Sequence, residues 1–211
     1  MPLGDPTPRL LALVILALAA SAATAQPLAA DAGEVEALSA ALRADQRAHL
    51  WRVGAWGLAN AVGGAVLVLA SARETQPGRW AFGVQSGAWG AVNLGIAVFG
   101  LAGGPGEVTA DWAAALGAEN GYADVLLVNL GLNAGYMAVG GTLLAVAGRG
   151  VSNPDAWRGH GAALVLQGAG LMALDAVAYA GTRGRLAALV EVASRAEVSA
   201  SAGGVRVVVG L

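Results

Sequence analysis

Polar side chains recur at helical spacing inside long apolar stretches of this sequence. Asn129, Asn133 and Tyr136 occupy positions i, i+4 and i+7, and Gln167 and Asp175 are eight residues apart. Residues at these spacings share one face of a helix. Ionisable and amide groups are costly within a membrane, where they usually face a bundle interior or a water-filled cavity. The pattern therefore predicts polar groups that converge inside a helical bundle.

A repeat in the first two apolar stretches adds two more polar positions. The segment Gly54–Asn60 reads G-A-W-G-L-A-N, and the segment Gly87–Asn93 reads G-A-W-G-A-V-N. The matching residues are Trp56, Gly57 and Asn60 in the first copy and Trp89, Gly90 and Asn93 in the second. Consecutive spans run antiparallel, so this is an inverted repeat, as in many transporters. The alternative, which we favour for two single helices, is a packing motif of small residues and a bonding asparagine.

These residues are predicted to form two layers. A buried polar cluster in the outer half of the bundle contains Asn60, Asn93, Asn129, Asn133, Tyr136 and Asp175. An inner polar layer contains Gln85 and Gln167. No cation occurs deep in a span, so amides and the Tyr136 hydroxyl are the expected partners of Asp175. The favoured interpretation is a network that holds the helices in register. The alternative is a site for a proton, an ion or a small polar solute.

Familiar catalytic and metal-binding patterns are missing from the sequence. It has no paired carboxylates, no G-x-S-x-G, no H-E-x-x-H and no phosphate-binding loop. It has no cysteine and two histidines, His49 and His160, which are predicted near opposite membrane faces and could not ligate one haem together. We therefore expect no enzymatic activity, no metal and no cofactor.

The composition is typical of a membrane protein. Only 12% of the 211 residues are charged, against about 25% in a soluble domain. Four stretches, 53–72, 80–106, 125–148 and 159–182, lack charges apart from Asp175. They predict spans at about 53–72, 80–104, 123–148 and 160–181, each long enough for the hydrocarbon core. The expected fold is all-α: an antiparallel bundle of four transmembrane helices over residues 53–182, with flanking amphipathic helices.

Arginine placement predicts the orientation of these spans. The first and third loops carry Arg73, Arg79, Arg149 and Arg158, whereas the second loop carries acidic residues and no cation. Positively charged loops stay in the cytoplasm, so the second loop and both mature termini should lie outside. We expect a multi-pass protein of a bacterial inner membrane.

Both ends of the chain are expected to lie outside the bundle. Residues 1–25 combine a basic start, a short apolar core and an A-T-A site, which indicates a cleaved signal peptide; an uncleaved fifth helix is the alternative. Residues 26–52 are predicted to be an external amphipathic segment with Asp31 as the N-cap of its helix. Residues 183–211 are predicted to be an external tail, with a short helix over 185–195 and a strand-like segment, Val205–Val209.

The order of the motifs resembles that of a family of small bacterial membrane proteins without a known activity. The resemblance is carried by the two W-G-x-x-N segments, by N-L-G-L-N-A-G-Y over Asn129–Tyr136, and by Gln167 with the later Leu171 and Asp175. It implies a signal peptide and four spans and covers most of the chain. Members of that family often carry aspartate where this chain has Asn133, which lowers the expectation of a two-carboxylate proton or metal site.

Two functional classes follow from these patterns. The favoured one is a structural or accessory membrane bundle, and the alternative is a small channel or transporter subunit that uses the buried polar cluster. The expected partners are membrane lipid and either a second copy of the chain or another membrane protein. The net charge of -2 gives no reason to expect nucleic acid.

Overall fold

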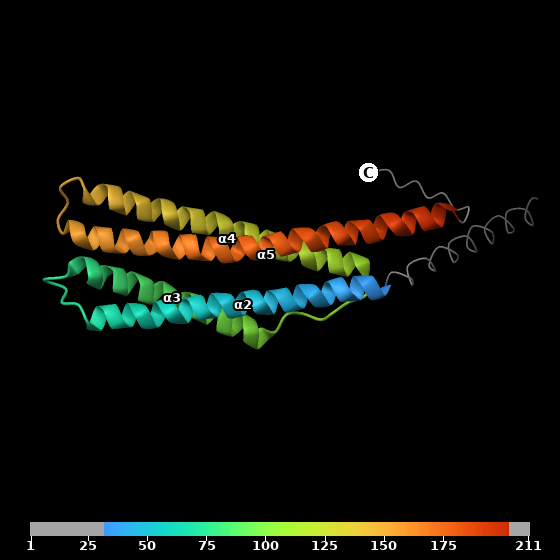
Figure 1. Ribbon diagram of the computed structural model, residues 1–211, viewed down its shortest axis with the longest axis horizontal. Coiled ribbons are helices and arrows are strands. Elements are labelled where there is room, and N and C mark those ends of the chain that lie inside the picture. The colour runs from blue at the N-terminus through green and yellow to red at the C-terminus, as the bar shows by residue number, and fades with distance from the viewer. Residues whose placement is uncertain (1–31, 203–211) are drawn as a thin grey trace, which may run out of the picture.

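Four long helices make up the part of the chain that the computed structural model describes, residues 32–202 (Figure 1). They are α2 (Ala32–Leu69), α3 (Pro77–Gly103), α4 (Trp112–Ala147) and α5 (Pro154–Ala202). No strand occurs between residues 32 and 202, and each helix is long and apolar enough to cross a membrane. The prediction of an all-helical chain with four apolar helices is confirmed. The predicted signal peptide, Asp31 and the segment Val205–Val209 lie outside the described residues.

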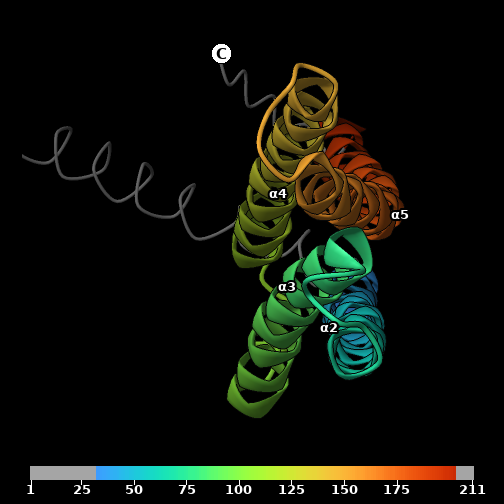
Figure 2. The same ribbon diagram turned by 90° about the vertical axis from the view of Figure 1, so that its left-hand side faces the viewer.

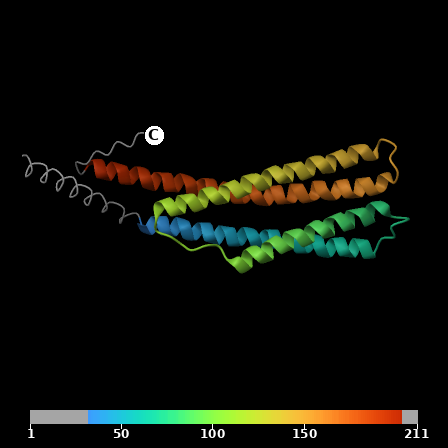
Figure 3. The ribbon, with the colours of Figure 1, turned by 180° about the vertical axis from the view of Figure 1, so that it is seen from behind.

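The helices form two antiparallel hairpins, α2–α3 and α4–α5, that lie side by side (Figures 1 and 2). We call the half of the bundle that ends at the connections 70–76 and 148–153 the loop half. The other end holds the start of α2 and the end of α5, and we call it the terminal half. α5 packs on α3 in the loop half, through Gly159 and Gly78, and on α2 in the terminal half. The backbones of α3 and α4 approach each other at most slightly, and their ribbons remain separate in the view from behind (Figure 3).

Glycine sets the closest approach between α2 and α3. A Cβ atom on Gly57 would lie 2.8 Å from the Gly90 carbonyl oxygen, and a Cβ atom on Gly90 would lie 2.6 Å from the Gly57 carbonyl oxygen. These distances leave no room for a side chain, so both helices need glycine at this crossing. The two copies of the W-G-x-x-N repeat therefore meet each other, as the packing-motif interpretation of the repeat requires.

The helices continue beyond the predicted spans. From Ala32 onward the predicted external segment is the first part of α2, α4 begins at Trp112, and α5 runs through the predicted tail helix. The flanking amphipathic helices are thus extensions of the bundle helices. At 38 residues, α2 measures about 57 Å, well over the roughly 30 Å of a hydrocarbon core. Part of α2 must therefore extend past the apolar layer of any membrane that it spans.

A small apolar core joins the extended ends. Val35 of α2, Ala115 of α4, and Leu189 and Val192 of α5 are buried against one another. Trp112 packs against this core and donates a 2.8 Å hydrogen bond from its ring nitrogen to the Leu189 carbonyl oxygen. The sequence predicted apolar faces on two separate surface helices. In the structure these faces pack together in one contact between three helices.

Candidate functional site

Asp175 is the centre of a buried polar site in the terminal half. One carboxylate oxygen lies 3.1 Å from His49 Nε2, and the other accepts a 2.7 Å hydrogen bond from Asn133 Nδ2. The three residues are buried and belong to α5, α2 and α4 respectively. His49 Nε2 faces a carboxylate oxygen, which leaves Nδ1 as the ring nitrogen available to a further partner.

His49 is a partner of Asp175 that sequence reasoning missed. The amide partner was predicted, and Asn133 fills that role. His49 was assigned instead to the external segment before the first span. Because α2 is continuous, His49 lies on the same helical face as Trp56, seven residues later. Extending the polar stripe of the first span backward by two turns would have found it.

A cavity of about 480 Å³ adjoins the Asp175–His49 pair. All four helices contribute to its lining. Five of the six residues of the predicted buried polar cluster line it: Asn93, Asn129, Asn133, Tyr136 and Asp175. The rings of Trp89 and Tyr136, which also line it, have centroids 4.6 Å apart. The structure thus brings the polar groups of three predicted spans to one hollow, beside a pair of aromatic rings.

Three side chains of the cavity lining have a buried polar atom without a hydrogen-bond partner among the described residues. These atoms are His49 Nδ1, Asn93 Nδ2 and the Tyr122 hydroxyl oxygen. They come from α2, α3 and α4. Buried polar groups in proteins are nearly always paired with protein atoms, ordered water or a bound molecule. The residues that line the cavity therefore have hydrogen-bonding capacity that the described part of the protein does not use.

Asn60 lies apart from this site, which differs from the prediction. Its side-chain oxygen accepts a 2.5 Å hydrogen bond from Gln167 Nε2, and Gln167 Oε1 accepts one of 3.0 Å from Trp56 Nε1. The physical reason is the inversion of the repeat. Asn60 and Asn93 each follow the Gly57–Gly90 crossing by three residues, but α2 and α3 run in opposite directions. The two asparagines therefore lie on opposite sides of the crossing, with Asn60 toward the loop half.

The two residues of the predicted inner layer have separate partners. Gln167 belongs to the Trp56–Asn60 network between α2 and α5. Gln85 Oε1 lies 3.1 Å from His160 Nδ1 and links α3 to α5 nearer the loops. These contacts form two successive bridges in the loop half rather than one layer.

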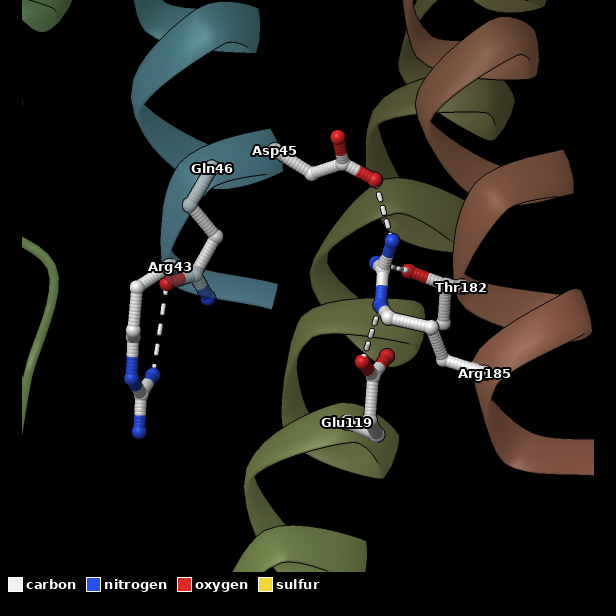
Figure 4. A network of polar contacts seen from close by, with 6 residues as sticks. All are labelled: Arg43, Asp45, Gln46, Glu119, Thr182 and Arg185. Carbon is white, nitrogen blue, oxygen red and sulfur yellow. Dashed lines mark hydrogen bonds and ion pairs between the residues drawn. The ribbon is translucent and has the colours of Figure 1, made fainter. Parts of the chain in front are cut away.

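A second set of charges lies in the terminal half, outside the cavity lining (Figure 4). The Arg185 guanidinium on α5 bonds both Glu119 of α4 and Asp45 of α2, and it donates a 3.1 Å hydrogen bond to Thr182 Oγ1. Glu119 is 2% exposed and Arg185 is also buried. One cation thus joins three helices. The sequence alone did not reveal this cluster, because each residue was assigned to a solvated segment or loop.

The fold and the site define a class: an all-helical protein with four helices apolar enough to span a membrane and a buried polar cavity between them. Within that class, the chain belongs to a family of unknown function (DUF6992), whose sequence model matches residues 52–176, more than half of the chain. The expectation of an uncharacterised family is confirmed. The comparisons with curated proteins and with solved structures find no match.

Proposed function

We propose that this protein is a multi-pass inner-membrane protein that binds a small ligand in the cavity beside Asp175. The observation that carries the proposal is the set of unpaired buried atoms on His49, Asn93 and Tyr122 around one hollow of about 480 Å³. Buried polar groups that a protein leaves unpaired usually bond ordered water or a bound molecule. Cavities of about 300–1,000 Å³ with a few convergent polar groups are typical of small-molecule sites.

The packing of the loop half supports a binding role over conduction. Between the cavity and the loops, Gln167 bridges α5 to Asn60 and Trp56 on α2. A Cβ atom on Gly140 would lie 2.7 Å from the Gly161 carbonyl oxygen, so α4 and α5 touch backbone to backbone. This packing favours a site that is reached from the terminal half alone. The same inventory of side chains gives no reason to propose enzymatic activity.

The proposed orientation places the terminal half on the external side of the membrane. Its support is the arginine pattern, with Arg73 and Arg79 in the first loop and Arg149 and Arg158 in the third. In that orientation both termini are external and the cavity lies in the outer leaflet. A ligand would then reach it from outside or from the surrounding lipid.

This function is tested by identifying the molecules that the full chain retains when it is purified from native membranes in lipid nanodiscs. We expect mass spectrometry to find a retained small molecule whose amount falls about tenfold in Asn93→Leu, which corresponds to about 1.4 kcal/mol. Asn120→Leu, at an exposed position on α4, is the matched control and should retain the wild-type amount. If the three proteins retain the same molecules in the same amounts, the cavity does not bind a ligand.

A further inference from the structure

We propose that the ligand is a neutral quinone-type molecule, a flat ring that carries carbonyl oxygens and an apolar tail. The inference rests on the proposed function and names the chemical class that the same cavity selects. Four features of the cavity lead to it: its balance of charge, its unpaired donors, its aromatic wall and its opening between α3 and α4.

The charges inside the cavity favour a neutral head group. The deepest ionisable groups are Asp175 and His49, and they face each other at 3.1 Å. A buried phosphate would therefore lie beside a carboxylate whose histidine partner is already engaged. Arg43 also lines the cavity, where its guanidinium donates to the Glu107 carbonyl oxygen at 3.1 and 3.2 Å and to Gln46 Oε1 at 3.3 Å. Its positive charge offsets the negative charge of Asp175, so the lining as a whole does not call for a charged ligand. A cationic head would find both oxygens of Asp175 already bonded.

The unpaired atoms call for acceptor oxygens on the ligand. Asn93 Nδ2 is a donor and cannot accept. The Tyr122 hydroxyl can donate as well, and it comes from α4, whereas Asn93 belongs to α3. Carbonyl oxygens on a ligand would satisfy these two donors without adding charge. His49 Nδ1 can donate or accept, so it suits either a carbonyl or a hydroxyl oxygen.

The aromatic wall of the cavity favours a flat ring. Trp89 of α3 and Tyr136 of α4 both line the cavity, and their ring centroids are 4.6 Å apart. Aromatic faces pack well against other flat, weakly polar rings. A ring placed beside them would stay near the Asn93 amide, which is one helical turn from Trp89 on α3.

The opening of the cavity suits an apolar tail. Ile96 of α3 and Val125 and Leu132 of α4 line the cavity, yet they are 56%, 56% and 49% exposed at the surface of the bundle. The backbones of α3 and α4 approach each other at most slightly, and these exposed residues of both helices belong to the lining, so the cavity reaches the surface between them. In a membrane this surface meets hydrocarbon. A tail that leaves the cavity there would pass directly into lipid.

Quenching of tryptophan fluorescence by a decyl-tailed benzoquinone tests the proposal, since Trp89 lines the cavity. With the full chain in phosphatidylcholine nanodiscs, we expect a saturable component of quenching above that of the other five tryptophans, and Trp89→Phe should remove this component. The Kd should rise about tenfold in Asn93→Leu and about threefold or more in Tyr122→Phe, equal to about 1.4 and 0.6 kcal/mol. Asn120→Leu and Tyr179→Phe, outside the cavity lining, are the matched controls and should stay within twofold of wild type.

A second variant covers the case in which Asn93→Leu does not fold. Ile96→Phe changes an exposed side chain at the opening without adding a tryptophan, and it should weaken quinone binding at least fivefold while leaving the fold intact. Non-saturable quenching that is equal in all variants would overturn the proposal. So would displacement of the quinone by phosphatidylglycerol at equal concentration, which would point to an anionic lipid.

The two experiments distinguish an error in the proposed function from an error in the ligand class. If a retained molecule depends on Asn93 but the benzoquinone does not bind, the ligand class is wrong and the binding function stands. If no retained molecule depends on Asn93 and the quinone does not bind, the binding function itself is wrong.

Discussion

Replacing Arg185 with methionine should lower the free energy of unfolding by about 3–5 kcal/mol, the usual cost of removing one partner from a buried ion pair. Arg185 is the shared partner of Glu119 and Asp45, which come from two other helices. Without the guanidinium, Glu119 is left as a buried and uncompensated charge. Equilibrium unfolding of the full chain in mixed micelles would measure the loss.

Arg183→Met is the matched control for this change. Arg183 is an exposed arginine two positions earlier on α5, and its replacement should change the free energy of unfolding by less than about 0.5 kcal/mol. Glu119→Leu added to Arg185→Met should recover part of the loss, because it removes the buried charge. If the double variant is no more stable than the single one, burial of the Glu119 charge is not the cause.

Replacing His49 with leucine should cost about 3 kcal/mol of stability for a similar reason. His49 supports one oxygen of Asp175, and Asn133 supports the other. The variant leaves a buried carboxylate with a neutral amide as its remaining partner. Asp175→Asn in the same background removes the charge and should restore part of the stability. The same unfolding measurement applies.

His160→Leu provides the comparison for His49. Among the described residues, His160 has a single neutral partner, Gln85, at 3.1 Å, so its loss should cost about 1 kcal/mol, the net value of one ordinary hydrogen bond. Equal losses at the two histidines would show that His49 contributes no more than a hydrogen bond. Failure of Asp175→Asn to rescue His49→Leu would lead to the same conclusion.

Helix identity and polar faces could be predicted from sequence because both are local properties. Apolar stretches without charges define the four helices, and spacings such as Asn129 to Asn133 report which residues share a face. These two properties were enough to predict the grouping of five of the six polar cluster residues, which line one cavity. Asn60 is the exception, because the position of each asparagine along the bundle depends on where the two antiparallel helices of the repeat cross. The crossing is fixed by contacts between Gly57 and Gly90, which no pattern within one helix reveals.

The charged partners could not be predicted because their burial depends on tertiary packing. His49, Asp45 and Arg185 occur near the ends of the apolar stretches, where charged residues usually face water. They are drawn into the bundle because α2 and α5 continue past the apolar stretches and pack together. Glu119 was assigned to the second loop because it lies outside the apolar stretches. It belongs to α4, which already begins at Trp112. Packing of the extended ends turns apparently solvated charges into structural ones.

We propose that the cavity is open to the terminal side and closed to the loop side. The chain has no cysteine, so single substitutions on α3 report on access without background. Asn93 lines the cavity, and Ser86, about two turns deeper, is buried in the packed loop half. We expect a membrane-impermeant thiol reagent to modify Asn93→Cys from the terminal side alone and to leave Ser86→Cys unmodified from either side. If Asn93→Cys is unreactive, or if both variants are modified, the cavity is not open to the terminal side alone.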